Sequence, residues 1–219
     1  EVDSETKEDL YIMKQNTERL LNLTNQLLDF RKTETRGFRL NFTECDVVAV
    51  LRETYLRFTS LAKQKGLDFI LELPQECFMA DVNQEALTKI ISNLLNNGVK
   101  YASTYLRISL ETDEKVFHIR TFNDGEMIPD TMKEEIFKPF VRFNEQEDGK
   151  VTTGTGIGLA LSRSLAEFHL GTLVMEAGEE SNIFCLTLPV VQDTTITLTP
   201  EAEVEIERVN EIPAEQAGK

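Results

Sequence analysis

The chain has 219 residues, 41% of them hydrophobic, which is enough for one substantial domain with a core and an appendage. Its formal net charge of −15 repels phosphate backbones at long range and argues against a nucleic-acid partner. Three widely spaced cysteines argue against a disulfide framework, and no run approaches the roughly 20 apolar residues that cross a bilayer, so we expect a cytoplasmic fragment without membrane contact.

The first predicted element is a long helix at residues 4–34, which contain no glycine or proline. Apolar residues recur there at spacings of three and four, from Met13 to Phe30, and further leucines widen the apolar stripe. So broad a stripe belongs in a helical bundle with more than one neighbour. We expect the partner helices to come from an oligomer or from a helix that precedes this sequence.

After Gly37 the pattern becomes that of a mixed α/β domain. Asp46 is the expected N-cap of a helix that ends at Lys65-Gly66. Strands are predicted at 38–42, 67–73, 78–80, 105–111, 116–122, 172–176 and 183–189, and further helices at 83–101 and 156–168. The stretch 123–153 is expected to be long and irregular.

Neighbouring strands joined by short turns, such as 105–111 and 116–122, imply antiparallel pairing. The predicted fold is an α/β (α+β) two-layer sandwich. Its mixed, mainly antiparallel sheet carries helices on one face, and one long bundle helix precedes it. Residues 191–219 are rich in Thr, Glu, Val and Pro without a core-forming period, which predicts an acidic linker or tail.

A glycine-punctuated run, Gly154-Thr155-Gly156-Ile157-Gly158-Leu159, is the first candidate for chemistry. Glycines at alternate positions leave backbone N–H groups uncovered, and the apolar residues that follow predict the start of a helix. Such a helix start attracts anions through its orphan donors and its dipole. Alone, the run could equally be an ordinary helix-entry loop.

The second candidate is a polar face of the predicted helix 83–101, which carries Asn93, Asn97, Lys100 and Tyr101. The opposite, apolar face would lie on the sheet. Asparagine oxygens suit Mg²⁺, and a lysine can meet a phosphate as a point charge. The alternative is a solvated face with incidental asparagines. Taken with the glycine run, the face suggests a nucleoside triphosphate with its metal.

Four segments in this order resemble the sensor histidine kinases, within the wider ATPase group shared with gyrase, the 90-kDa heat-shock chaperone and mismatch-repair ATPases. They resemble the N box (Asn93–Tyr101), the first glycine box (Asn123-Asp124-Gly125 with Ile128-Pro129), the F box (Phe137–Phe140) and the second glycine box (Gly154–Leu159). The resemblance covers about residues 5–190. It implies that residues 1–36 are part of the second helix of the dimerisation and phosphotransfer hairpin. Residues 37–190 would be the ATP-binding catalytic domain, and 191–219 a linker that could lead to a receiver domain, as in a hybrid sensor.

The resemblance also implies roles on the helix 83–101. Asn97 would bind Mg²⁺ with Asn93 beside it, Lys100 would contact phosphate, and Tyr101 would flank the base or the phosphates. Asn93 stands where the hydrolytic relatives have a water-activating Glu. Because a carboxamide cannot serve as that base, phosphoryl transfer is favoured over hydrolysis.

At the first glycine box the sequence departs from the family. Asn123 stands where the family usually has an Asp that receives the adenine amino group, and Asp124 would take this role only if the loop register shifts. Gly125 would let the backbone approach the base, with Ile128 completing this part of the nucleotide site. Met127 replaces a glycine and could reshape the pocket floor.

At the triphosphate, residues 141–153, including Arg142, would form a flexible lid. The amides around the glycine run would cradle the phosphates, so that the implied nucleotide ligands there are Gly154, Thr155, Gly156, Gly158 and Leu159.

The function implied by the resemblance is Mg²⁺-assisted transfer of the γ-phosphoryl group of ATP to a histidine of the phosphoacceptor helix of the same kinase. Implied partners are that helix and a response regulator receiver domain, with homodimerisation through the N-terminal helix and a parent protein anchored in the cell inner membrane. His118, in a predicted strand, and His169, at a helix end, lack the acceptor's surroundings, so the acceptor would lie outside this chain.

Three alternatives stay open. The first is a degenerate nucleotide-binding signalling module without kinase activity, which Asn123 and Met127 support. The second is an ATP hydrolase of the same superfamily. The third, a structural interaction protein, leaves the four ordered segments unexplained.

Overall fold

The computed structural model describes residues 4–35, 39–143, 155–178 and 180–192. The long helix predicted at the N-terminus is present as α1 (Ser4–Thr33). The remaining helices are α2 (Val47–Gln64), α3 (Gln84–Tyr101) and α4 (Gly158–Phe168), with short 3₁₀ turns η1 (Asp130–Met132) and η2 (Glu135–Phe137). The strands are β1 (Thr43–Asp46), β2 (Asp68–Glu72), β3 (Met79–Val82), β4 (Tyr105–Thr112), β5 (Val116–Asn123), β6 (Thr172–Glu176) and β7 (Asn182–Pro189).

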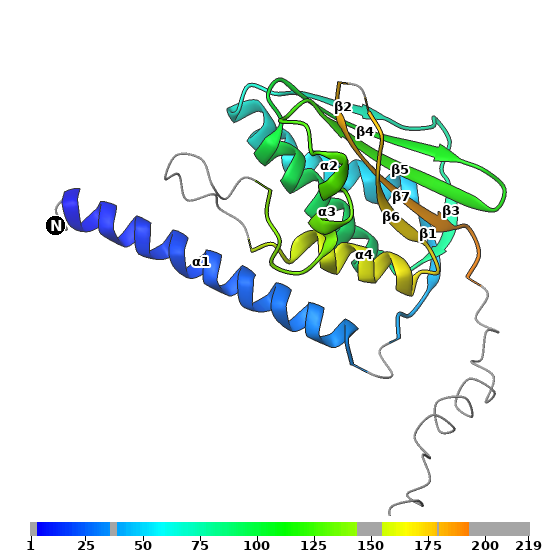
Figure 1. Ribbon diagram of the computed structural model, residues 1–219, viewed down its shortest axis with the longest axis horizontal. Coiled ribbons are helices and arrows are strands. Elements are labelled where there is room, and N and C mark those ends of the chain that lie inside the picture. The colour runs from blue at the N-terminus through cyan, green and yellow to red at the C-terminus, as the bar shows by residue number, and fades with distance from the viewer. Residues whose placement is uncertain (1–3, 36–38, 144–154, 179, 193–219) are drawn as a thin grey trace, which may run out of the picture.

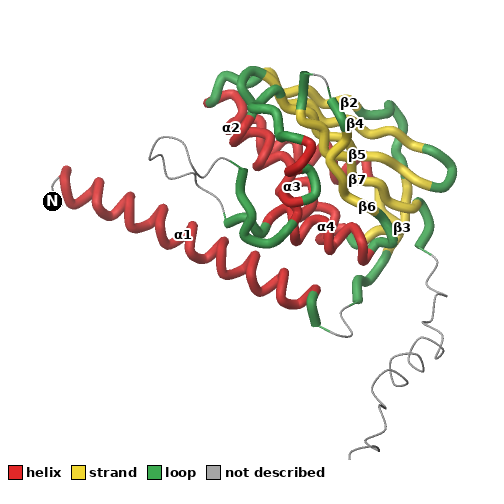
Figure 2. The backbone as a smooth tube through the Cα atoms, viewed as in Figure 1, coloured by secondary structure: helices red, strands yellow, loops and turns green. Residues whose placement is uncertain are grey.

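The main sheet has five strands in the order β2-β4-β5-β7-β6. Only β2 and β4 run parallel in it; the β4–β5, β5–β7 and β6–β7 pairs are antiparallel. Strands β1 and β3 form a separate antiparallel pair. Figures 1 and 2 show α2, α3 and α4 as one layer on one face of this sheet, with α1 beyond them. The predicted two-layer sandwich with a mainly antiparallel sheet is confirmed.

The strand predicted at residues 38–42 is wrong in position. Residue 38 lies outside the described residues, and residues 39–42 join no ladder; the strand is β1, which begins at Thr43 opposite Val82. The apolar alternation instead reflects packing, because Leu40 contacts the core and the Phe42 ring lies edge-on to that of His169, with 5.3 Å between centroids.

Side-chain caps fix where two helices begin. Asp46 accepts from Val48 N at 3.0 Å, as predicted, and also from Phe78 N at 3.2 Å, which ties the start of α2 to the chain before β3. Asn83 caps α3 by accepting from Ala86 N at 2.9 Å. These caps supply acceptors to N–H groups that the helix itself leaves unpaired.

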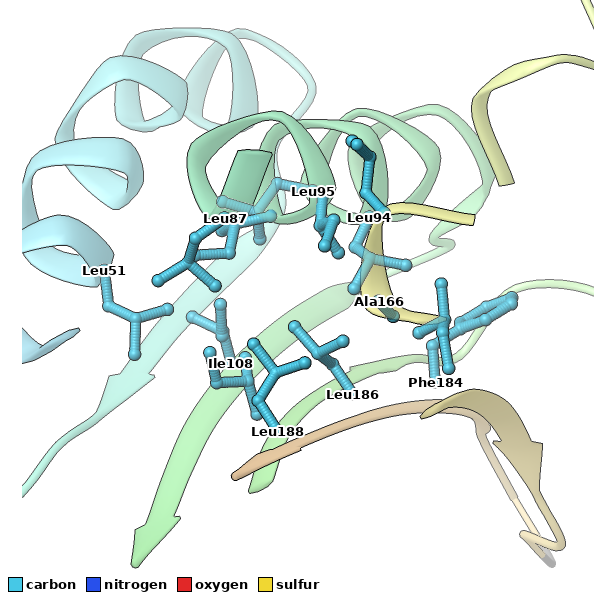
Figure 3. Close-up of a cluster of buried hydrophobic side chains, with 14 of the residues drawn as sticks. Leu51, Leu87, Leu94, Leu95, Ile108, Ala166, Phe184, Leu186 and Leu188 are labelled. Atoms are coloured by element: carbon cyan, nitrogen blue, oxygen red, sulfur yellow. The ribbon is translucent and has the colours of Figure 1, made fainter. Parts of the chain in front are cut away.

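The core lies between the helix layer and the sheet (Figure 3). Leu87 and Leu95 of α3 are fully buried against Ile108, Leu186 and Leu188 of the sheet. Burying each such side chain stabilises the fold by about 1.5–3 kcal/mol. Because the apolar face of α3 is held on the sheet in this way, its asparagine-bearing face is turned away from the sheet.

Helix α1 lies along the outer side of the helix layer (Figure 1). An ion pair of 2.9 Å joins Asp29 of α1 to Lys89 of α3. Many apolar side chains of α1 are exposed nonetheless, namely Leu10, Tyr11, Ile12, Met13, Leu20, Leu21, Leu23, Leu27 and Leu28. Among the helices described, none combines the length and apolar character needed to span a membrane.

Candidate functional site

A cavity of about 280 Å³ lies where α3, the start of α4 and the loop after β5 meet. From the face of α3 it is lined by the four predicted residues Asn93, Asn97, Lys100 and Tyr101. From the glycine run it is lined by Thr155, Gly156, Gly158 and Leu159. The two segments singled out in the sequence, more than fifty residues apart, therefore form walls of one site.

On the α3 wall the asparagines differ in their bonding. Asn93 donates through Nδ2 to Gly158 O at 3.2 Å and to Ser162 Oγ at 3.1 Å, and thereby ties α3 to the start of α4. Asn97 is half-buried, and its side chain hydrogen-bonds to none of the described residues. Its neutral oxygen is thus available to a hard cation, which fits the predicted Mg²⁺.

Lys100 supplies positive charge to the same wall. Its Nζ lies 2.6 Å from the hydroxyl of Tyr101 and 4.4 Å from the centre of that ring. Tyr101 is 45% exposed, so this pair lies at the mouth of the cavity and can meet an entering anion.

At the opposite wall the first turn of α4 is open, while the Ile157 N–H just before it donates to Thr155 Oγ1 at 3.2 Å. Among the described residues, α4 has no side-chain cap, and Gly158 and Leu159 of its first turn face the cavity. Uncapped N–H groups at a helix start attract anions. Gly156 has a φ of +69°, and a Cβ there would lie 2.8 Å from the backbone of Phe140. Gly154 lies outside the described residues.

The segment before the predicted lid is fastened to α4. Phe140, with φ of +67°, donates its N–H to Gly156 O at 2.9 Å. Arg163 of α4 stacks 3.9 Å from the ring centre of Phe137 and pairs with Glu134 at 2.8 Å. Arg142 lines the cavity directly after this fastened segment, whereas residues 144–153 of the predicted lid lie outside the described residues.

The buried end of the cavity is made by two carboxamides. Asn123, at the end of β5, is 4% exposed, and Asn182, at the start of β7, is 2% exposed. Asn182 holds the loop after β5 by accepting from Ile128 N at 2.9 Å and donating to Glu126 O at 2.9 Å. The predicted residues Asn123 and Ile128 both line the cavity.

The structure does not bring two predicted residues to the cavity. Asp124 turns its carboxylate to the chain after α3, where it accepts from the N–H groups of Ser103, Thr104 and Tyr105. Burial raises its pKa, but the hydrogen bond from the Thr104 hydroxyl, together with these backbone bonds, outweighs that effect and lowers the pKa to about 2. At Gly125 a Cβ would lie 2.1 Å from Tyr101 O, so the glycine serves close packing against the end of α3.

Asp124→Ala is expected to lower the free energy of unfolding by about 2 kcal/mol and to change nucleotide affinity less than about twofold, because the carboxylate holds backbone and does not line the cavity. The folded-state pKa lies below the unfolded value, so this stabilisation is present above about pH 4 and is lost as pH falls toward 2. Urea denaturation at several pH values and titration calorimetry measure both effects.

A suitable control is Asp113→Ala, since Asp113 accepts from a single backbone N–H, that of Lys115, at 3.3 Å. It should cost clearly less stability than Asp124→Ala. Loss of nucleotide binding with unchanged stability in Asp124→Ala would contradict this structural role of Asp124. It would favour the alternative in which Asp124 receives the adenine amino group.

Several lining residues carried no usable signal in the sequence. Gln26 of α1 accepts from Thr155 Oγ1 at 2.9 Å, yet on the helical pattern it is one polar residue among many. Asn182 lies 59 residues after Asn123 and follows no motif. The other unpredicted residues of the lining are Asn96, Glu126, Ile136 and Phe184, whereas Val141 and Phe143 belong to the predicted lid segment. Met127, which stands where the family has a glycine, does not line the cavity and is 40% exposed.

Comparison with known proteins agrees with this geometry. The protein-family profile described as Histidine kinase-, DNA gyrase B-, and HSP90-like ATPase matches residues 82–203. Histidine kinase P4 of Formosa agariphila is 31% identical over 196 residues, 85% of this chain and 14% of that protein. Sensor histidine kinase WalK of Bacillus subtilis is 25% identical over 189 residues, 84% of this chain and 31% of that protein. The chain spans 14%, 12% and 19% of the length of three curated relatives that it matches.

Solved structures give the same result. The catalytic domain of histidine kinase ThkA matches with a TM-score of 0.63 and 25% identity, over 70% of this chain and 98% of that one. Full-length ShkA in complex with AMPPNP matches with a TM-score of 0.75 and 18% identity, over 86% and 40% of the two chains. ThkA in complex with response regulator protein TrrA matches with a TM-score of 0.70 and 21% identity, over 89% and 54%. The last two, at this identity, show the fold alone.

Proposed function

Since this chain belongs to the family of histidine kinase-, DNA gyrase B- and HSP90-like ATPases and carries the catalytic ATP-binding domain of a sensor histidine kinase, we propose that it binds Mg-ATP and transfers the γ-phosphoryl group to a histidine outside these 219 residues. The observation that carries the proposal is the meeting, in one cavity, of the unbonded Asn97 amide with the open helix start at Gly158.

Each wall has a task in this function. The amides at the start of α4 and around Gly156 hold the phosphates, and Lys100 and Arg142 offset their charge. Asn97 holds the metal, with the Oδ1 of Asn93 next to it on the same face. When bound, Mg²⁺ neutralises phosphate charge and so favours attack by a neutral nucleophile. The protein's share is positioning and charge, which is what phosphoryl transfer needs most.

Transfer rather than hydrolysis is favoured by the chemistry of Asn93. A carboxamide cannot take a proton from water, and its Nδ2 is already committed to Gly158 O and Ser162 Oγ. An imidazole acceptor needs no such base, because its neutral ring nitrogen is itself a nucleophile.

Neither histidine of the chain is placed to accept the phosphoryl group. His169 is fully buried, with Nδ1 2.7 Å from Leu165 O and Nε2 accepting from Asn83 N at 3.1 Å; its burial lowers its pKa. His118 points to the sheet face away from the helices, opposite in alternation to Asn123, and contacts Thr187. The acceptor is therefore a histidine of another segment.

We assign residues 1–36 to the second helix of the dimerisation and phosphotransfer hairpin, 37–190 to the catalytic domain and 191–219 to a linker. The exposed apolar side chains of α1 support a helical partner, as in a homodimer of a longer, membrane-anchored kinase. A response regulator receiver domain is the proposed second partner; a ThkA structure that matches this fold is a complex with the response regulator TrrA.

The test is transfer in trans. The chain is mixed with a histidine-bearing helical hairpin and with Mg-ATP labelled at the γ-phosphate, and the label is followed on the hairpin and as free phosphate. We expect label on the hairpin as acid-labile, base-stable phosphohistidine. Free phosphate at an equal rate without labelled hairpin would favour a hydrolase. No saturable ATP binding at millimolar concentration would favour the signalling module without kinase activity.

A further inference from the structure

The amide orientations at the buried end of the cavity decide which hydrogen-bonding groups it offers. In Asn182, Nδ2 donates to Glu126 O and Oδ1 accepts from Ile128 N, both at 2.9 Å. Exchanging its oxygen and nitrogen would set acceptor against acceptor and donor against donor. The Asn182 amide therefore has one orientation.

That orientation fixes the amide of Asn123 in turn. Its Oδ1 accepts from Gly125 N at 3.3 Å and from Asn182 Nδ2 at 3.5 Å. Turning the amide over would aim Nδ2 at two donors, so the oxygen faces the loop. Both lone pairs of this oxygen are then engaged, and Nδ2 is the atom left for a ligand.

The Nδ2 of Asn123 opens into the cavity. It hydrogen-bonds to none of the residues that the structure describes, and it is not among the fully buried side-chain atoms that lack a partner. Because the residue as a whole is only 4% exposed and lines the cavity, the atom can be reached only from there. The buried end of the site thus offers a hydrogen-bond donor.

We propose that this donor selects a nucleotide whose base carries an acceptor at position 6, a 6-oxopurine nucleoside triphosphate, in preference to ATP. The inference rests on the proposed function and on the role that the family resemblance implies for Asn123, in which position 6 of the purine base binds at this residue. Adenine carries an amino group there, whereas guanine and hypoxanthine carry a carbonyl oxygen. An amino group would meet Nδ2 donor to donor, and a buried donor without an acceptor is costly.

A site that hydrogen-bonds a particular ligand group rejects an analogue that lacks it, because its own polar atom is then left unpaired. ATP remains a ligand through its phosphates, with weaker affinity. The base thus sets which triphosphate supplies the γ-phosphoryl group, without altering the phosphate end of the cavity.

The experiment is calorimetric titration of the 219-residue chain with the Mg²⁺ salts of ITP, GTP, ATP and purine riboside triphosphate, which has only hydrogen at position 6. ITP should bind at least tenfold more tightly than ATP, with purine riboside triphosphate between them. Asn123→Asp should reverse the order of ITP and ATP. Asn22→Asp, the same change at an exposed position of α1, should leave the ratio as it is.

ATP binding as tightly as ITP, or more tightly, in the unaltered chain would overturn the inference and leave the proposed nucleotide site standing. Failure of all four triphosphates to bind would overturn the proposed function itself. Should Asn123→Asp not fold, the ratios measured on the unaltered chain decide the matter.

Discussion

Gly156→Ala is expected to lower the free energy of unfolding by about 2–4 kcal/mol and to weaken nucleotide binding at least tenfold. The residue has a φ of +69°, and a left-handed backbone costs a side-chain-bearing residue about 1–3 kcal/mol. A Cβ there would also lie 2.8 Å from both Cα and C of Phe140. Backbone atoms cannot rotate away, so the two segments must separate.

The loss of binding follows from the same contact. Phe140 N donates to Gly156 O at 2.9 Å, and this hydrogen bond sets the path of the chain from Gly156 into the first turn of α4. From the sequence, a methyl group at Gly156 would be expected to crowd the phosphates. The structure gives a different cause, since the methyl meets protein backbone before any ligand is bound.

Gly158→Ala is the matched control. A Cβ at Gly158 would meet the Asn93 side chain at 3.6 Å, an ordinary contact, and the residue is the first of α4. Alanine favours a helix over glycine by up to about 1 kcal/mol, so stability should be unchanged or raised. Urea denaturation of both variants gives the comparison. Equal losses of stability in the two variants would show that the close contact between Gly156 and Phe140 does not explain the destabilisation by Gly156→Ala.

The elements most accurately predicted are those whose signals are local. The N-cap role of Asp46 was predicted from the capping preference of aspartate, and the strand 172–176 from its local sequence. Both predictions are confirmed. The alternation at 38–42 failed because an alternating apolar pattern reports alternating burial, not hydrogen-bonded pairing. In this segment Leu40 packs against the core and Phe42 packs against the ring of His169, and neither joins a ladder.

The site residues could be predicted where helical spacing within one segment places them on a common face. They could not be predicted where the fold brings residues from distant segments together. Asn93 and Asn97 share a face of α3 by helical geometry alone. Asn123 lines the cavity and Asp124 does not, because the Asp124 carboxylate turns to the backbone N–H groups of residues 103–105. Those residues lie about twenty positions earlier in the chain, so the sequence around Asp124 does not reveal them. The second amide of the buried end, Asn182, comes from another strand and is placed by the β5–β7 register.

That register also explains why the buried end is rigid. Asn123 lies directly opposite Asn182 in the β5–β7 pair, so the ladder itself brings their side chains to one face of the sheet. Asn182 then fastens the loop after β5 at two backbone atoms, Glu126 O and Ile128 N. A substitution at Asn182 would release the loop and the orientation of Asn123 together, so the two effects could not be separated by that change.

Asn97→Ala is expected to remove most of the Mg²⁺ dependence of nucleotide binding while leaving the fold intact. The side chain of Asn97 makes no hydrogen bond to the described part of the chain, so its removal leaves no protein group without a partner. Alanine is also the better helix former by about 0.5 kcal/mol. The free energy of unfolding should therefore stay the same or rise slightly.

Nucleotide affinity should fall at least tenfold with Mg²⁺ present, because a neutral oxygen that holds the cation is gone. With a chelator present, the variant and the unaltered chain should bind the free nucleotide alike. Asn22→Ala, at an exposed position of α1, should leave both affinities unchanged. Calorimetric titration with and without Mg²⁺ measures these quantities. An Asn97→Ala chain that keeps its full response to Mg²⁺ would place the cation elsewhere, and the polar face of α3 would then have no assigned ligand.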